Sequence, residues 1–265
     1  MNHRLRARTL LHYPPAMPEI DVAAFYRFVT ITDREDMRSR LLARCLELKI
    51  LGTILLASEG INATIAGAPT SIAALRDFFE TIPELAKMTW KISHCETPPF
   101  KRMLIKRKKE IVTIGLDDLP VVGHTGTYVP PSEWDALIAR KDVVLIDTRK
   151  NREVEEGTFV GALNPKLDNF RQFPGWVDQL NGIDQDQPVA MFCTGGIRCE
   201  KATALMKQRG YRNVFHLEGG ILAYLEQTKN INKSWQGTCY VFDGRGTVDD
   251  ELQPAPRTVY DPRRA

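Results

Sequence analysis

Two kinds of hydrophobic spacing run through the first 115 residues. Short apolar runs rich in β-branched and aromatic residues are typical of buried strands, and apolar positions three and four residues apart are typical of amphipathic helices. Thr32 and Glu35 have the spacing of a capping box, and Thr70 is a second candidate helix cap. We expect strands at 22–31, 54–57, 61–66, 90–93 and 111–114, with helices at about 33–49 and 70–79. The order β-α-β-β-α-β is that of a ferredoxin-like α+β unit, here over residues 20–115.

The second part of the chain contains continuous apolar runs instead. Such strands are covered on both faces, as in a parallel sheet. The runs lie at 143–146, 189–192 and 214–217, and helical patterns begin at Pro131 and cover 171–180 and 197–209, with Gly210 as a stop. This alternation predicts an α/β domain, in which ligands bind beyond the carboxyl ends of the parallel strands. The residues directly after Phe192 are therefore the first candidates for chemistry.

Length and charge favour two domains with different roles. The chain has 265 residues, of which 43% are hydrophobic, and this suits one large or two modest domains. The first 115 residues carry a net charge of +6 and the remainder −3, so the first half is the better candidate to meet an anionic partner. We expect an N-terminal arm (1–19), a ferredoxin-like domain (20–115), a linker (116–130), an α/β domain (131–230) and a C-terminal extension (231–265).

The sequence contains no apolar run of about 18 residues, so we expect no transmembrane helix. The basic start of the chain reaches Pro14-Pro15 after too short an apolar stretch for a signal peptide, and reads as a basic arm or a transit peptide. The five cysteines include no C-x-x-C pair, which argues against a disulfide framework and a closed zinc site. We expect a reducing, cytoplasmic setting.

A cysteine loop follows the buried strand that ends at Phe192. Its residues are Cys193, Thr194, Gly195, Gly196, Ile197, Arg198 and Cys199. Glycines allow successive backbone N–H groups to point inward as an anion-binding nest, and the following helix adds its positive N-terminus. Together with Arg198 these features favour a thiolate, so Cys193 is the candidate nucleophile rather than a structural cysteine. Cys199 is a resolving thiol, a second catalytic thiol or part of the core.

Around this loop the chain resembles rhodanese domains over about residues 125–230. The resemblance rests on Asp147-x-Arg149-x-x-x-Glu153-x-x-x-Gly157, on Gly161-Ala162-x-Asn164-Pro165, and on Leu217-Glu218-Gly219-Gly220. Thr158 departs from the pattern, since many rhodaneses have histidine there. Arg198 is five residues after Cys193, a sulfurtransferase-type spacing one residue shorter than in rhodanese-like phosphatases. We expect Asp147 to fix the loop after its strand, and Arg149 and Glu153 to pair and brace the wall of the site.

A more specific resemblance extends over about residues 20–245. The cysteine loop, the stretch Gly52–Asn62, Pro99–Met103, Glu110–Gly115 and Phe170–Pro174 are similar to the tRNA uridine(34) hydroxylase family. That resemblance implies oxygen-dependent formation of 5-hydroxyuridine at the wobble position of tRNA, with Cys193 as the catalytic cysteine and the anticodon arm as partner. The alternatives are a sulfurtransferase with a Cys193 persulfide and a non-catalytic RNA-binding or adaptor protein.

A basic segment lies beside Phe100. It contains Lys101, Arg102, Lys106, Arg107, Lys108 and Lys109. These residues could neutralise tRNA phosphates while Phe100 stacks on an unpaired base, or they could be a basic sheet edge that prevents aggregation. With a tRNA-modifying family in view, we favour RNA contact.

The sequence offers no candidate for a cofactor. It has no facial triad for iron and no G-x-G-x-x-G nucleotide motif, so we expect no metal site, and the cofactor is unknown. Molecular oxygen enters as co-substrate through the family resemblance alone. His216 on a buried strand is expected to be a core histidine.

Overall fold

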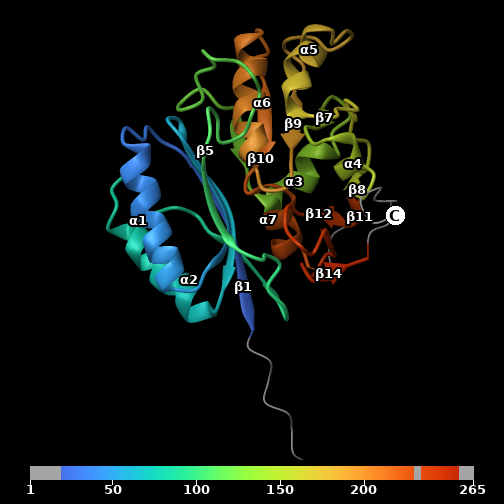
Figure 1. Ribbon diagram of the computed structural model, residues 1–265. Helices are drawn as coiled ribbons and strands as arrows, with labels where there is room; N and C mark the ends of the chain where they lie inside the picture. The colour runs from blue at the N-terminus through green and yellow to red at the C-terminus, as the bar shows by residue number, and fades with distance from the viewer. Residues whose placement is uncertain (1–18, 230–233, 257–265) are drawn as a thin grey trace, which may run out of the picture.

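The computed structural model describes residues 19–229 and 234–256; most of the expected N-terminal arm and parts of the C-terminal extension lie outside the described residues. Two bodies lie side by side in Figure 1. The first contains α1, α2 and an antiparallel sheet with one added strand, and the second contains a parallel sheet with helices around it. The molecule is thus a two-domain α/β protein, as expected.

A five-stranded sheet forms the first domain, in the order β4-β1-β3-β2-β5. Its strands are β1 (Ile20–Phe28), β2 (Leu51–Ala57), β3 (Gly60–Gly67), β4 (Lys91–Cys95) and β5 (Met103–Arg107). The pairs among the first four strands are all antiparallel, whereas β5 pairs with β2 in parallel. The expected ferredoxin-like βαββαβ unit is therefore present, and β5 is an added edge strand.

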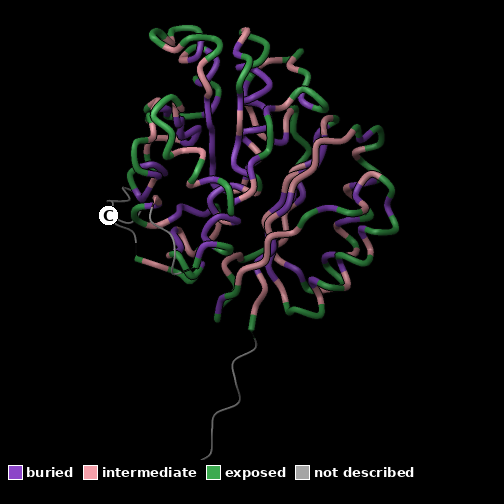
Figure 2. Tube along the Cα trace, turned by 180° about the vertical axis from the view of Figure 1, so that it is seen from behind, coloured by how far each residue is buried: buried purple, intermediate pink, exposed green. Residues whose placement is uncertain are grey.

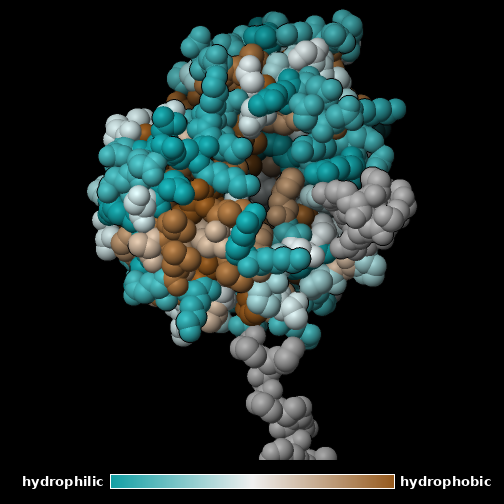
Figure 3. All heavy atoms as spheres, in the orientation of Figure 1, coloured by the Kyte–Doolittle hydropathy of each residue, from teal (hydrophilic) through white to brown (hydrophobic). Residues whose placement is uncertain are grey.

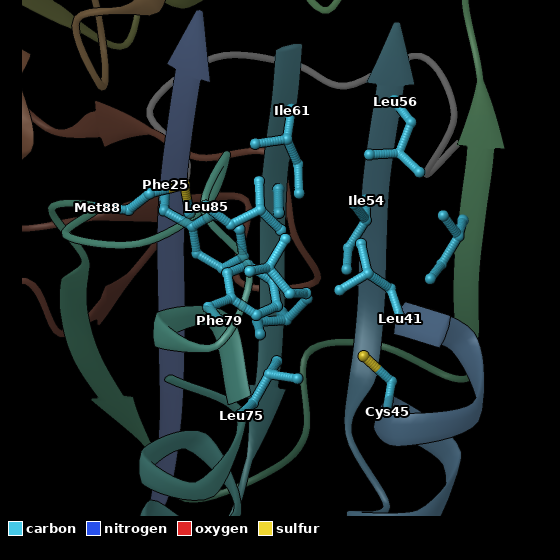
Figure 4. Packing of buried hydrophobic residues seen from close by; sticks show 14 of the residues in the cluster. Phe25, Leu41, Cys45, Ile54, Leu56, Ile61, Leu75, Phe79, Leu85 and Met88 are labelled. Carbon is cyan, nitrogen blue, oxygen red and sulfur yellow. The ribbon is translucent and has the colours of Figure 1, made fainter. Parts of the chain in front are cut away.

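Two helices, α1 (Arg34–Glu47) and α2 (Pro69–Glu80), cover one face of this sheet. Figure 4 shows Phe25 and Ile54 of the sheet directed toward Leu41 and Phe79 of the helices. All four side chains are buried. Because side chains alternate across a strand, the intervening residues form a second face that the helices leave open.

The helix caps differ from those expected. Asp33, not Thr32, caps α1: its carboxylate accepts the amides of residues 35 and 36 at 3.1 and 2.9 Å. The helix α2 begins at Pro69 rather than after Thr70, since proline fits a first helical turn, where no intrahelical N–H bond is required.

The strand expected at 111–114 is absent, because the amides in this segment bind carboxylates instead of a neighbouring strand. The Ile111 amide donates to Glu59 Oε1 at 2.6 Å, and the Ile114 amide donates to Glu110 Oε2 at 3.0 Å. The last strand of this sheet, β5, is formed by part of the basic segment itself.

The second domain is built on a four-stranded parallel sheet in the order β6-β10-β9-β7. Its strands are β6 (Thr127–Val129), β7 (Val144–Asp147), β9 (Val189–Phe192) and β10 (Val214–Leu217). β6 lies in the stretch that was expected to be linker. Figure 2 shows the central strands of this sheet as buried, which explains their continuous apolar runs.

Five α-helices and one 3₁₀-helix belong to the described part of this domain. They are α3 (Pro131–Ile138), α4 (Asn151–Val154), η1 (Phe170–Gln172), α5 (Phe173–Asp178), α6 (Ile197–Gln208) and α7 (Gly220–Gln227). The expected helix at 171–180 is thus η1 followed by α5. Gly210 follows α6 with a φ of +94°, in the left-handed conformation that ends helices.

Short strands attach the C-terminal residues to the second domain. β11 (Trp235–Gly237) pairs with β8 (Gly157–Phe159), and β12 (Cys239–Tyr240), β13 (Thr247–Val248) and β14 (Pro254–Ala255) form a small antiparallel sheet. Among the described residues, no helix has both the length and the apolar character needed to cross a membrane.

The aromatic core of the first domain gives a stability prediction. Phe79 is fully buried, and its ring lies 5.4 Å from that of Phe25 and 5.2 Å from that of Trp90. We expect Phe79→Ala to lower the free energy of unfolding by about 3–5 kcal/mol, because it leaves a cavity. The half-buried neighbour Phe78 is the matched control, and Phe78→Ala should cost less than half as much. Urea denaturation measures both; equal losses would contradict this packing account.

Candidate functional site

The carboxyl end of β9 places Cys193 over the first turn of α6. The Gly196 amide donates to Cys193 Sγ at 3.2 Å, and Gly196 is the N-cap of α6 with a φ of +96°. A side chain at Gly196 would lie 2.9 Å from the Tyr26 hydroxyl. The glycine therefore provides both the turn and the close approach of the first domain.

The loop environment lowers the pKa of the Cys193 thiol. Burial opposes ionisation, but a hydrogen bond from the Cys199 thiol, the charge of Arg198 and the amides at the start of α6 outweigh it. Cys199 is buried, its pKa is raised by that burial, and its sulfur lies 3.8 Å from Thr148 Oγ1. Cys199 therefore stays a thiol that can donate to the Cys193 thiolate.

The start of α7 holds the same loop from within the domain. The amides of Ile221 and Leu222 donate to the carbonyls of Cys193 and Thr194, both at 3.0 Å. Gly220 has a φ of +68°, and a Cβ there would lie 2.5 Å from the Cys193 carbonyl oxygen. This contact gives a structural reason for the closing Leu-Glu-Gly-Gly signature.

Two buried ion pairs support the wall of the site, and they differ from the expected pairing of Arg149 with Glu153. Arg149 instead binds Asp147, with Nη2 to Oδ2 at 2.6 Å. Glu153 binds Arg198 through two bonds, of 2.8 and 2.9 Å. Asp147 and Arg149 thus brace the loop after β7, while Glu153, in α4, fixes the arginine of the cysteine loop.

Thr158 does not disrupt this wall. Its hydroxyl donates to Asp147 Oδ2 at 2.9 Å, beside the Arg149 contact. The departure from the rhodanese pattern therefore still provides a hydrogen-bond donor to the buried carboxylate.

The first domain contributes side chains that sequence reasoning missed. Tyr26 of β1 donates to Glu200 Oε1 at 2.8 Å, and Lys91 of β4 donates to the Gly195 carbonyl at 2.9 Å. Glu200 also accepts a bond of 2.7 Å from Tyr128. No local sequence pattern marks Tyr26 or Lys91, because each meets its partner only after the domains pack together.

A cavity of about 550 Å³ lies where the two domains meet. Its walls come from the open face of the first sheet, the cysteine loop and the segments between the C-terminal strands. Its lining includes Tyr26, Leu55, Lys91, Phe100, Cys193 and Gly195. Figure 3 shows a hollow on this side of the molecule, with hydrophobic surface beside it. The Cys193 sulfur thus borders a largely apolar, partly open cavity of nucleotide size.

Within the cysteine loop, Thr194, Gly195, Ile197 and Arg198 line the same cavity as Cys193. Thr194 is buried and accepts a weak bond of 3.4 Å from Arg198. Cys199 is behind the loop, fully buried in the hydrophobic cluster of the second domain.

The basic segment is divided between the two faces of β5. Lys106 is paired with Leu55 in the sheet register, so its side chain emerges on the cavity face. Arg107 emerges on the helix face and binds Glu35 of α1 at 2.7 Å. Phe100 lines the cavity, whereas Lys101, Arg102, Lys108 and Lys109 are exposed around the ends of the strand.

His216 is buried in β10, as expected for a core histidine, with its ring 4.2 Å from that of Tyr128. Burial lowers the pKa of His216 to about 4, so the ring is neutral near pH 7. Within residues 19–229 and 234–256, no group of three or more His, Cys, Asp or Glu side chains is arranged to hold a metal ion.

Comparison with known proteins agrees with this architecture. Residues 20–111 match the UPF0176 acylphosphatase like domain, and residues 130–227 match the rhodanese-like domain. A tRNA uridine(34) hydroxylase of Rhizobium leguminosarum bv. trifolii (strain WSM2304) is 46% identical over 245 residues, which are 92% of this chain and 78% of the relative.

Solved structures similar to parts of the chain include other rhodanese-like proteins. A rhodanese-like domain protein of Staphylococcus aureus is 25% identical, with 37% of this chain and 90% of that chain covered and a TM-score of 0.31. A rhodanese-like domain from Anabaena is 16% identical, with 52% and 91% covered and a TM-score of 0.36.

A parallel sheet that ends in a cysteine loop over a helix N-terminus, with α7 glycines packed on that loop, defines a rhodanese-domain protein. Here that domain follows a ferredoxin-like domain that closes one side of the site. The similarity to the Rhizobium relative extends across both domains. The chain belongs to the tRNA uridine(34) hydroxylase family.

The environment of Cys193 predicts that its thiol loses its proton at an acidic pH. A thiol has an ordinary pKa of about 8.5, and the lowered pKa of Cys193 means that its proton is lost below neutral pH. We expect the ultraviolet absorbance of a thiolate to rise in a step below pH 7 in the native protein, and to lose that step in Cys193→Ser. A step that persists in Cys193→Ser would assign the thiolate to another cysteine.

Proposed function

We propose that this protein hydroxylates uridine 34, the wobble base of tRNA, to 5-hydroxyuridine, with Cys193 as the catalytic residue and molecular oxygen as co-substrate. The observation that carries the proposal is the cavity of about 550 Å³ between the domains, which Cys193 borders. Its support is the 46% identity to a protein named for this reaction, over both domains that form the cavity.

The cavity suits a base that has left its stack. Enzymes that modify a base in RNA bind it unstacked, and loops such as the anticodon loop present such bases. Phe100 provides an aromatic face in the cavity wall on which a pyrimidine can stack. The sheet face offers both apolar contacts, from residues such as Leu55, and polar groups, from residues such as Asn62, to the bound ring.

Cys193 is proposed to act as a nucleophile toward the uracil ring. Position C6 of uracil is electrophilic, so a thiolate can form an Sγ–C6 bond while the C5–C6 double bond opens. The electron pair moves to C5 and the C4 carbonyl, which makes C5 nucleophilic toward an oxidant. The lowered pKa of Cys193 supplies the thiolate near pH 7 without a separate base.

The tRNA is proposed to approach along the β5 edge. Lys106 emerges on the cavity face, and the exposed basic residues Lys101, Arg102, Lys108 and Lys109 lie before and after it in the basic segment. A phosphate backbone that delivers its base to Cys193 would pass these charges, and the contact would depend on salt. The anticodon arm is the proposed partner, and the cytoplasm, where tRNA is used, is the proposed location.

Replacing the sulfur tests the reaction itself. We expect Cys193→Ser to abolish 5-hydroxyuridine in tRNA, measured by mass spectrometry of nucleosides from a deletion strain that carries the variant. Cys95→Ala is the matched control. This buried thiol is in the last residue of β4 and donates to the Thr97 carbonyl, so its loss should leave the modification intact. Full hydroxylation with Cys193→Ser would refute a catalytic role for the cysteine.

The same experiment separates the sulfurtransferase alternative. If deletion leaves 5-hydroxyuridine unchanged, while the purified protein gains one sulfur atom on Cys193 and forms thiocyanate from thiosulfate, the hydroxylase proposal is wrong. Normal cellular function of the protein without Cys193 would instead favour an RNA-binding adaptor.

The two faces of β5 allow a paired test of tRNA binding. We expect Lys106→Ala to weaken binding of the anticodon arm several-fold and to reduce the slope of log affinity against log salt by about 1, as the loss of one phosphate contact does. Arg107→Ala should change neither, because this guanidinium is turned to the helix face and paired with Glu35. Fluorescence anisotropy over a salt series measures both, and equal effects would contradict the assigned tRNA path.

A further inference from the structure

Three consecutive carbonyl groups of the cysteine loop are each held from outside the loop. The amides of Ile221 and Leu222 in α7 hold the carbonyls of Cys193 and Thr194. The third carbonyl, of Gly195, is held by the ammonium group of Lys91 at 2.9 Å. Two of these restraints come from the second domain, whereas the third crosses from the first domain.

The Gly195 carbonyl belongs to the same peptide unit as the Gly196 amide. In a trans peptide the C=O and N–H bonds lie in one rigid plane and point in opposite directions. Lys91 binds the carbonyl oxygen at one end of this unit, and the amide at the other end donates to Cys193 Sγ at 3.2 Å. An ammonium bound to the carbonyl oxygen also polarises the amide, which strengthens its bond to the sulfur.

Both glycines allow this peptide to rotate freely, so its orientation must be imposed. Gly195 has no atom within 4 Å of the place where a Cβ would lie, so packing against a side chain does not fix it. Gly196 adopts a φ of +96°, a region in which glycine has little intrinsic preference. The Lys91 contact supplies an external restraint on this peptide.

We propose that Lys91 is a positioning residue for Cys193: it holds the Gly195 carbonyl so that the Gly196 amide points at the sulfur. Lys91 is half-buried, with its Nζ 5.3 Å from the centre of the Tyr26 ring. Its positive charge adds directly to the stabilisation of a thiolate. The rhodanese loop therefore obtains part of its anion-binding character from the first domain.

Several other groups act on the same sulfur and must be kept in place in any test. The titratable and charged groups near Cys193 on the packed elements are Arg198, Cys199 and Glu200 of α6, Tyr26 of β1 and Lys91 of β4. The carboxylate of Glu200 opposes ionisation of the thiol, and Tyr26 stays a neutral donor to Glu200. The charges of Lys91 and Arg198 favour ionisation. Removing Lys91 therefore shifts the balance toward the neutral thiol.

The experiment measures the pH dependence of Cys193 alkylation by iodoacetamide, read by mass spectrometry of the peptide that contains Cys193. Because both a charge and an oriented donor are lost, we expect Lys91→Met to raise the pKa of Cys193, which is about 5 in the wild type, by about one unit. Alkylation should then slow roughly tenfold near pH 4, below both pKa values, and only about twofold near pH 6. Lys91→Arg keeps the charge and the donors and should restore most of the rate.

Lys201→Met is the matched control. Lys201 is a second lysine that joins the domains, through Glu59 at 2.8 Å and Glu110 at 2.6 Å, but its ammonium binds these carboxylates rather than the cysteine loop. We expect this variant to leave the pKa of Cys193 unchanged. If the pKa rises as much as in Lys91→Met while limited proteolysis shows that the domains are still docked, the thiolate does not depend on the Lys91 contact and the proposal is wrong.

An unchanged pKa in Lys91→Met would equally overturn the proposal. Should Lys91→Met not fold, Lys91→Gln replaces it, because glutamine retains a neutral donor. The proposal then requires that the pKa of Cys193 in Lys91→Gln lies above the wild-type pKa, and an unchanged pKa overturns it. The inference deepens the proposed function, but the measurement uses the protein without tRNA. Failure of the hydroxylation test and failure of this test are therefore distinguishable.

Discussion

The arrangement of the molecule depends on burying the first turn of α6 against the first domain. Glu200 and Lys201 are adjacent, oppositely charged and at most 5% exposed. Burying a charge is costly unless partners replace its water. Tyr26 and Tyr128 donate hydrogen bonds to Glu200, while Lys201 donates to the carboxylates of Glu59 and Glu110. The rhodanese domain alone lacks most of these partners, so the two domains complete one buried polar network.

This network places the cysteine loop at the boundary of the domains rather than on an open surface. The charge of Arg198 is largely matched by Glu153 through two short bonds, so it is fixed in place as well as partly neutralised. The thiolate of Cys193 therefore relies on several modest contributions: the arginine, the Cys199 thiol and backbone amides. Such a distributed arrangement keeps the sulfur ionised while leaving its cavity side free for a substrate.

Local patterns in the sequence predicted the parts of the site that are built locally. The strand to Phe192, the glycine turn and the helix ending before Gly210 all depend on neighbouring residues, and the structure has them. The segment 111–114 was misassigned because its β-branched residues resemble a strand, although the carboxylates of the distant Glu59 and the neighbouring Glu110 bind its amides. The contacts of Lys91 and Tyr26 join residues more than 100 positions apart, so no local spacing could reveal them.

The positions of the charged residues in the two domains explain why positive charge is concentrated in the first part of the sequence. The first domain carries the positive excess, and it supplies both an exposed basic edge on β5 and a lysine directed at the cysteine loop. The second domain supplies the sulfur and its helix N-terminus. In the proposed reaction, a polyanion that follows the basic edge reaches a sulfur whose negative charge is compensated from both domains. Without that compensation, the thiolate would repel the phosphates next to the bound base. With it, one site can bind a polyanion and hold an anionic nucleophile.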